Sequence, residues 1–286
     1  MMLPLAAMDR SRGFTLIEAI AVIVITGIIA SVVAVFIRAP VEGYFDTVRR
    51  AQLTDTADTA LRRISRDLRL ALPNSIRVTN SAGKTYLEFL MTRAGGRYRA
   101  ECESATSGDP LIFGDASAYA CEAADNGGFD VIGPPVAVAA GDQIVVYNLG
   151  TAGADAYAGD TRRAYAGAAG QVGNIQYGGG PFPLASPGRR FHIVETPVTY
   201  ECDSSNAAGG SLRRYWGYSI MSAQPSPPSG GTTVSALLAD QVTACVFTYD
   251  PNVANLRTGL VSLQIVLTSA GENVRLFHQV HVRNVP

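Results

Sequence analysis

The sequence predicts an α+β fold, in which one long N-terminal helix packs on antiparallel β-sheets. Two observations carry this prediction. The first is an apolar run from Phe14 to Ile37, followed by a segment of helical periodicity that reaches Pro73. The second is the change after Pro73 to short β-branched and aromatic runs, separated by segments rich in glycine, alanine, serine and proline.

The composition is that of a folded chain with an apolar segment. The chain has 286 residues, of which 47% are hydrophobic and 16% charged, and its formal net charge is −1. This is too apolar and too weakly charged for a disordered protein. A near-neutral chain is also atypical of nucleic-acid-binding proteins, which usually carry a positive excess. The length is sufficient to bury a hydrophobic core.

The apolar run is long enough to cross a membrane. Residues 14–37 would form a helix about 36 Å long, against a bilayer core of about 30 Å. Arg10 and Arg12 precede the run, so the positive-inside rule predicts a cytoplasmic N-terminus and an external C-terminal domain. A secretory signal peptide fits less well, because its apolar region spans roughly 7–15 residues. A plain membrane anchor explains the run, apart from one residue.

That residue is Glu18, a carboxylate inside the apolar run. A carboxylate near the bilayer centre costs about 2.5–3.5 kcal/mol on insertion scales, and less near the end of a helix. No basic residue within the run is placed to pair with it, and Arg12 reaches it only partway by snorkelling. Glu18 therefore needs a partner or a function.

The residues around Glu18 resemble a known processing site. Arg12-Gly13-Phe14-Thr15-Leu16-Ile17-Glu18 resembles the site at which type IV prepilins and type II secretion pseudopilins are cut. The resemblance implies that a prepilin peptidase cleaves between Gly13 and Phe14 and methylates the new amino group of Phe14. It further implies that Glu18 of one subunit neutralises the Phe14 ammonium of a neighbour during assembly, which agrees with the cost of an unpaired charge in an apolar surrounding.

Three further segments resemble the O-type minor pilins of mannose-sensitive haemagglutinin pili. They are 40–46 (PVEGYFD), 61–74 (LRRISRDLRLALPN) and 245–250 (CVFTYD). Major pilins usually carry a proline where Val35 stands here, and they are usually much shorter, so the resemblance implies a minor subunit. The J-type minor pseudopilin of type II secretion is the alternative. Either family would place the chain with other minor and major subunits, at the fibre tip.

Residues 41–72 predict an amphipathic helix that continues the apolar one. Its expected apolar stripe comprises Val41, Phe45, Val48, Ala57, Ala60, Leu61, Ile64, Leu68 and Leu72. Asp58 with Arg62, and Arg63 with Asp67, are spaced for i,i+4 ion pairs. Pro73 is expected to stop the helix, and Pro40 with Gly43 to kink or break it. The arginines suit a solvated face better than a nucleic-acid site.

Beyond Pro73 the pattern predicts strands. Those expected are 75–79, 85–92, 143–149, 191–195, 213–220, 260–268 and 273–282, the last two joined by a hairpin at 269–272. The segments 150–188 and 222–234 are expected to be mostly loops. The expected organisation is thus a leader at 1–13, a membrane helix at 14–37, its continuation at 38–73 and a periplasmic β-rich domain at 74–286.

Four cysteines, Cys102, Cys121, Cys202 and Cys245, lie in the part predicted to be outside the cytoplasm, where disulfides persist. Proximity in sequence favours the pairs Cys102–Cys121 and Cys202–Cys245, although four cysteines allow three pairings.

No catalytic motif is present, so we expect a structural protein of the inner membrane and pilus, with no enzyme activity and no cofactor. Weaker site hypotheses concern a metal at the histidines, a calcium loop, an aromatic sugar platform and a tip adhesin with loops 150–188 and 204–234. The metal hypothesis concerns His192, His278 and His281. The calcium hypothesis concerns Asp240, Asp250 and Asn252, and the sugar hypothesis concerns Tyr215, Trp216 and Tyr218.

Overall fold

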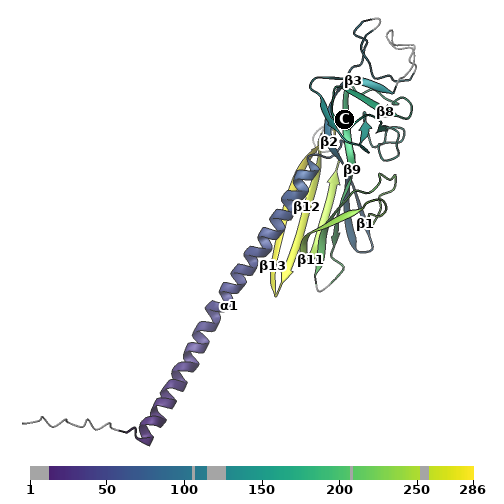
Figure 1. The fold of residues 1–286 in the computed structure, drawn as a ribbon. Helices are drawn as coiled ribbons and strands as arrows, with labels where there is room; N and C mark the ends of the chain where they lie inside the picture. The colour runs from purple at the N-terminus through teal and green to yellow at the C-terminus, as the bar shows by residue number, and fades with distance from the viewer. Residues whose placement is uncertain (1–12, 105–106, 115–126, 207–208, 252–257) are drawn as a thin grey trace, which may run out of the picture. The chain divides into compact units, whose positions relative to one another are not determined.

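The computed structural model describes residues 13–104, 107–114, 127–206, 209–251 and 258–286. Within these ranges it contains one helix and two antiparallel sheets, which confirms the α+β class (Figure 1). The chain divides into two compact units, Met1–Ala51 and Gln52–Pro286. The helix runs through both units, and every described strand belongs to the second.

The helix α1 (Leu16–Leu68) is 53 residues long and contains Pro40. Of the kink or break expected at Pro40 and Gly43, the break is wrong, because the helix continues without interruption on both sides of the proline, and the kink stays a prediction. Proline removes one backbone donor and crowds the preceding turn. The turns around it are supported by a 2.7 Å ion pair between Arg38 Nε and Glu42 Oε1, which brackets Pro40.

The helix ends at Leu68, before the expected stop at Pro73. The reason is backbone pairing with the sheet. The N–H of Leu72 donates to the carbonyl of Leu90 (2.8 Å), and the N–H of Thr92 donates to the carbonyl of Leu70 (2.9 Å). The chain has therefore left the helix to join strand β2 before the proline is reached.

The structure has thirteen strands within the described ranges. They are β1 (Arg77–Ser81), β2 (Lys84–Tyr98), β3 (Gly128–Ile132), β4 (Val136–Val138), β5 (Gln143–Val145), β6 (Arg162–Tyr165), β7 (Gly170–Val172), β8 (Asn174–Gly178), β9 (Arg190–Asp203), β10 (Gly210–Trp216), β11 (Val234–Asp250), β12 (Thr258–Ser269) and β13 (Glu272–Arg283).

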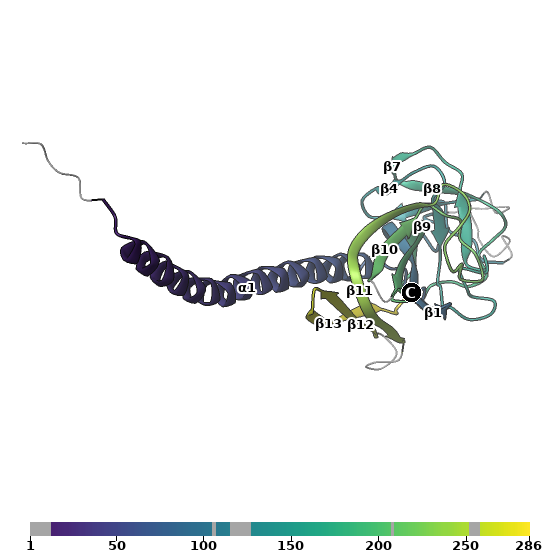
Figure 2. The same ribbon diagram turned by 90° about the horizontal axis from the view of Figure 1, so that it is seen from below.

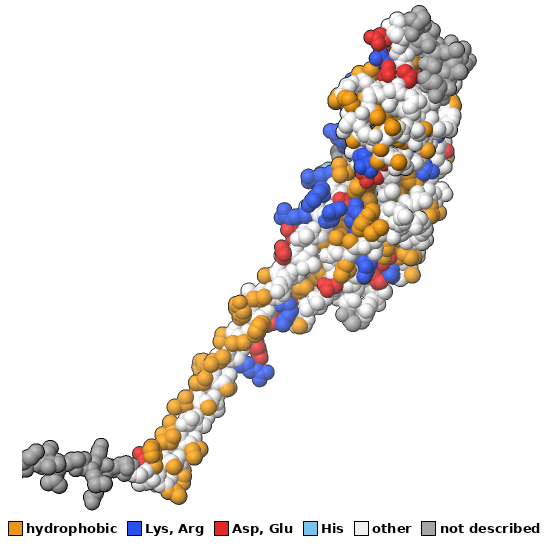
Figure 3. All heavy atoms as spheres, in the orientation of Figure 1, with side chains coloured by type: hydrophobic (Ala, Val, Ile, Leu, Met, Phe, Trp, Pro, Cys, Tyr) orange, Lys and Arg blue, Asp and Glu red, His pale blue; other side chains and the backbone are white. Residues whose placement is uncertain are grey.

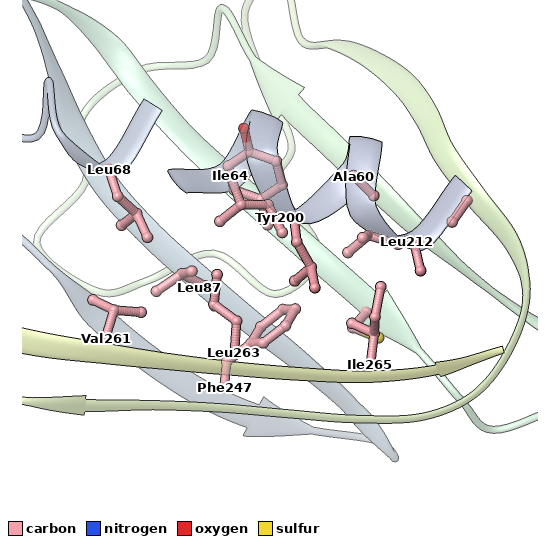
Figure 4. Packing of buried hydrophobic residues seen from close by; sticks show 14 of the residues in the cluster. Ala60, Ile64, Leu68, Leu87, Tyr200, Leu212, Phe247, Val261, Leu263 and Ile265 are labelled. Carbon is pink, nitrogen blue, oxygen red and sulfur yellow. The ribbon is translucent and has the colours of Figure 1, made fainter. Parts of the chain in front are cut away.

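One part of the large sheet faces α1. Its strands pair antiparallel in the order β1-β2-β9-β10-β11-β12-β13, and we call it the helix-facing sheet (Figures 1 and 2). Ala57, Ile64 and Leu68 of α1 are almost completely buried against its inner side chains. Figure 4 shows this core, with Ala60, Ile64 and Leu68 above Leu87, Tyr200, Leu212, Phe247, Val261, Leu263 and Ile265. Burial of each large aliphatic side chain contributes about 1.5–3 kcal/mol.

The predicted stripe on the helix is confirmed for residues 57–68 but not throughout. Ala57, Ala60, Leu61, Ile64 and Leu68 are buried, together with Leu53, which the expected stripe omitted. Val41 and Phe45 are exposed and belong to the other unit, and Leu72 is buried beyond the helix, beside Leu90.

The other part of the sheet closes on itself. The antiparallel pairings run β2-β3-β8-β6-β5-β9 and return to β2, so that the long strands β2 and β9 belong to both parts. A second core fills this closed circuit, with Tyr98, Phe129, Ile175, Phe191 and Ile193 at its centre. The separate pair β4–β7 adds Val136, Val138 and Val172 to the same core.

Most predicted strands are confirmed as strands, and their lengths differ. The hairpin at 269–272 joins β12 to β13, with positive φ at Ala270 and Gly271, as a tight two-residue turn requires. The expectation that 150–188 is mostly loop missed β6, β7 and β8, which are only three to five residues long. The long strand β11 was also missed; its pattern of exposed and buried residues is irregular, with a shifted register near Val242.

A buried carboxylate links the helix to the sheet. Asp67 lies on α1 and is only 4% exposed. Its Oδ2 atom accepts hydrogen bonds from the Tyr200 hydroxyl on β9 (2.7 Å) and from Arg214 Nε on β10 (2.8 Å). The predicted partner Arg63 is also present, with its Nε 3.4 Å from Oδ1. The predicted Asp58–Arg62 pair is a separate, exposed contact of 2.6 Å.

Replacement of Asp67 should be far more destabilising than replacement of Asp58. Asp67→Ala leaves the Arg214 guanidinium without its carboxylate in a buried site, which costs about 3–5 kcal/mol of the free energy of unfolding. Asp58→Ala removes an exposed i,i+4 pair worth about 0.3–0.5 kcal/mol. Urea unfolding of the full chain in detergent, followed by the fluorescence of Trp216, the sole tryptophan, measures both. Equal losses for the two variants would contradict the anchoring role of Asp67.

Candidate functional site

The candidate site is the start of α1, where the chain passes from an extended segment into the helix. Gly13, Phe14 and Thr15 precede the first helical residue, Leu16. The Thr15 carbonyl accepts hydrogen bonds from the N–H groups of Glu18 and Ala19, each at 3.1 Å. The Thr15 hydroxyl oxygen also accepts from the Glu18 N–H at 3.3 Å. Thr15 is therefore the N-cap of α1.

This cap is part of the motif, and our sequence analysis missed it. The spacing Thr15-x-x-Glu18 is that of a capping box, in which the first residue caps the helix and an acidic residue stands at its third position. That pattern alone was sufficient to predict the first residue of the helix. Thr15 thus places the start of α1 directly after the Gly13–Phe14 bond.

The Gly13–Phe14 bond lies in non-helical, exposed backbone. Phe14 is 79% exposed. A Cβ atom added to Gly13 would meet no atom of the described residues within 4 Å, so the described part of the chain does not itself require glycine there. A requirement for glycine would come from the pocket of the enzyme that cuts the bond. Arg10 and Arg12, the predicted leader charges, lie outside the described residues.

No other described residues pack against the first turns of α1. Leu16, Ile17 and Ile23 are each more than 70% exposed, and apolar side chains follow one another along this part of the helix (Figure 3). An 18-residue window of α1 has a mean hydropathy of 3.0 and no buried residue. By length and composition this helix can cross a membrane. The exposed apolar surface is far larger than the patches that soluble monomers tolerate.

Glu18 is the acidic residue of the first turn of α1. Its side chain is exposed and receives no hydrogen bond from the described residues. The N-terminal end of a helix carries a partial positive charge, which favours a carboxylate at this position and disfavours an ammonium. If the chain is cut after Gly13, the Phe14 ammonium stands at this positive end, and a nearby carboxylate becomes the group that best stabilises it.

In a comparison with protein families, residues 8–34 match the prokaryotic N-terminal methylation motif. The match supports a type IV pilin-like protein. It covers the cleavage site, the cap, Glu18 and most of the apolar run, and it implies processing by a prepilin peptidase in a membrane and pilin-assembly context. No curated protein and no solved structure matches the chain.

The cysteine prediction is tested at one pair. Cys202 and Cys245 form a disulfide with their Cα atoms 6.4 Å apart, and this is the pair that sequence proximity favoured. It joins β9 to β11 across the end of β10, at the core that packs on α1. The other favoured pair, Cys102–Cys121, includes Cys121, which lies outside the described residues.

The predicted sugar-binding platform of Tyr215, Trp216 and Tyr218 is wrong, because the three side chains do not lie on one surface. Tyr218 is 1% exposed, and its hydroxyl donates to buried Glu88 (3.0 Å). Burial raises the pKa of Glu88 above its usual value, although Arg77 and Tyr218 oppose the shift by hydrogen bonding to the carboxylate. Trp216 instead packs against the core beneath α1. Tyr215 and Trp216 are consecutive on β10 and so face opposite sides of the sheet.

The described residues contain no group of His, Cys, Asp and Glu that is placed to hold a metal ion. His192 lies on β9, whereas His278 and His281 lie on β13, three residues apart. Burial, with Arg190 nearby, lowers the pKa of His192 to about 4. Asp240 lies near the middle of β11 and Asp250 at its last position, and Asn252 of the calcium hypothesis is outside the described residues.

Processing should remove residues 1–13. Mass spectrometry of the chain purified from cells that contain a prepilin peptidase should give a protein that begins at Phe14 and is heavier by one methyl group. Gly13→Leu should block this cleavage and leave folding unchanged, because no described residue beyond its chain neighbours contacts that position. If the chain without substitutions kept residues 1–13 in the presence of the peptidase, the assigned cleavage site would be wrong.

Proposed function

We propose that the chain is a minor pilin of a type IV pilus, a structural and assembly component and not an enzyme. The observation that supports this proposal most directly is a prepilin motif that leads into an apolar helix with no buried residue among those the structure describes. Before assembly the helix anchors the protein in the inner membrane in a single pass, with the N-terminus cytoplasmic and residues 74–286 periplasmic. In the fibre, neighbouring subunits replace the lipid around it.

The proposed assembly step depends on charge. Cleavage leaves an ammonium at Phe14, and every subunit also brings the carboxylate of Glu18. Either charge alone in an apolar fibre core is costly, and the two together offset much of that cost. When Glu18 of one subunit meets Phe14 of the next, the pair also fixes their axial register, which apolar contacts alone leave undefined.

Several features support a minor subunit of the O-type, which primes or caps the fibre tip. They are the length of 286 residues, Val35 in place of a mid-helix proline, and the resemblance of three segments to O-type minor pilins. A J-type minor pseudopilin of type II secretion is the alternative, because the same processing motif serves both systems. Neighbouring genes for pilus adhesion or for protein secretion distinguish the two.

Loss of the Glu18 charge should affect assembly and not processing. We expect Glu18→Ala to be cleaved and methylated but to pair poorly with partner subunits, so that a deletion strain regains few pili. Glu42→Ala is the matched control, because Glu42 lies on the same helix, outside the motif, in an exposed pair with Arg38. Electron microscopy counts the pili. Full piliation with Glu18→Ala would show that charge pairing is unnecessary.

One observation supports a tip adhesin as a second function. The segments 150–188 and 204–234, singled out for this role, meet at an open cleft of about 620 Å³. Gly159 and Arg162 line it from the first segment, and Tyr218, Ile220 and Thr232 from the second. The Arg162 side chain forms no hydrogen bond or ion pair with the described residues, so it remains available to an acidic or hydroxyl-rich ligand.

Glycan binding by the full chain in detergent tests this second function. An adhesin should bind members of a broad glycan array, and Arg162→Gln should reduce that binding. Trp216→Phe should leave it unchanged, because Trp216 does not line the cleft. The absence of binding across the array, or equal losses in the two variants, would exclude this cleft as the adhesive site.

A further inference from the structure

A groove of about 440 Å³ lies between the last turns of α1 and strands β10 and β11. On the helix side it is lined by Ala60, Arg63 and Arg66, and on the strand side by Trp216, Ala236 and Leu238. All of these residues belong to the unit Gln52–Pro286. Figure 3 shows basic side chains gathered beside this part of α1.

The floor of the groove is apolar and rigid. Trp216 stands at the end of β10, directly opposite Val234 of β11, while Arg214 is opposite Ala236. The Arg214 guanidinium lies 4.8 Å from the centre of the Trp216 ring and is fixed from the other side by Asp67. An indole held in this way offers a flat apolar contact surface that loses little conformational entropy on binding.

The rim of the groove carries more positive charge than the described residues neutralise. Arg63 and Arg214 share the single carboxylate of Asp67, and Arg66 lines the same groove. Oδ2 of that carboxylate already accepts two hydrogen bonds, from Tyr200 and Arg214. Arg63 Nε is buried beside Oδ1 without a hydrogen bond, and Arg66 has neither a hydrogen bond nor an ion pair within the described residues. The exposed Arg66 side chain, beside the half-exposed Arg63, therefore favours an incoming carboxylate.

Arg62, on the same turns of α1, differs from Arg63 and Arg66. Arg62 points away from the groove, is strongly exposed and pairs with Asp58. The charge of Arg62 is therefore neutralised outside the groove, whereas Arg66 lines the groove without a carboxylate partner among the described residues. Tryptophan and arginine are also the residues most enriched among those that dominate binding at protein interfaces.

We propose that this groove binds an extended segment of a neighbouring subunit, one that presents a carboxylate next to an aliphatic side chain. The carboxylate would accept charge-assisted hydrogen bonds from Arg63 and Arg66, and the aliphatic group would pack on Trp216 and Leu238. The inference rests on the proposed function only in naming a pilus subunit as the source of the segment. The chemistry of the ligand follows from the groove alone.

The experiment uses the full chain in detergent and a fluorescein-labelled peptide that alternates leucine and glutamate. Anisotropy of the label reports binding, and emission of Trp216, the sole tryptophan, reports whether binding occurs at the groove. We expect saturable binding, a change in Trp216 emission at the same peptide concentrations, and weakening by salt. A peptide with lysine in place of glutamate should not bind.

Two variants separate the groove from general electrostatics. Arg66→Gln should weaken peptide binding about tenfold, since it removes a charge-assisted hydrogen bond. Arg62→Gln removes the same charge one turn away and should change the affinity by less than about twofold. Neither variant touches the processing motif, so cleavage at Gly13 and binding at the groove succeed or fail independently.

Other results would overturn the proposal. Equal losses in Arg62→Gln and Arg66→Gln would show binding to the whole basic face. A rise in anisotropy with unchanged Trp216 emission would place the peptide elsewhere. Tighter binding of a single-stranded oligonucleotide than of the peptide would identify a nucleic-acid site. Trp216 emission that depends on protein concentration, without peptide binding, would show that a second copy of this chain covers the groove.

Discussion

One end of helix α1 packs on the sheet of its own chain, and the other end needs an apolar surrounding that the described chain does not supply. The rest of the structure depends on this constraint. From Gln52 onward α1 buries its apolar side chains against strands of its own chain. From Leu16 to Val35 the same helix leaves its apolar side chains uncovered. An apolar surface of this size is stable only in lipid or against other proteins. The fold is therefore complete at one end of the helix and requires a partner at the other.

Two carboxylates on α1 illustrate the same division. Asp67 is buried, and its partners Tyr200 and Arg214 come from strands of the same chain. Glu18 receives no side-chain hydrogen bond from the described residues, although it too is destined for an apolar surrounding if the helix enters a membrane or fibre. The cation that suits Glu18 is absent from the apolar run and would arise by cleavage after Gly13. Asp67, paired within its own chain, is therefore part of a structural ion pair, whereas Glu18 is the proposed assembly site.

The sequence was most informative where local chemistry decides the structure. Apolar length predicted the helix, the stripe Ala57–Leu68 predicted its buried face, and Ala270-Gly271 predicted a tight turn. The capping box at Thr15 was equally local and could have been predicted. The partners of Asp67 could not, because Tyr200 and Arg214 are 133 and 147 residues away and only sheet pairing brings them to the helix. The same holds for the closed strand circuit, whose short strands β5, β6 and β8 gain their stability from the shared core.

The distribution of charge bears on how a minor subunit would recognise its neighbours. Apolar contacts between helices in lipid or in a fibre are strong but not directional, and any subunit with an apolar helix can make them. Selectivity must then come from polar groups on the globular part. Within the described chain several arginines are committed to internal carboxylates: Arg77 to Glu88, Arg93 to Asp142 and Arg99 to Asp130. Arg66 stands apart from these pairs at the edge of a rigid apolar groove. Arg66 has no carboxylate partner among the described residues, and it lines the groove together with Trp216, which contacts Arg214. A groove with this charge and this apolar contact is suited to distinguish one partner from others that carry a similar apolar helix.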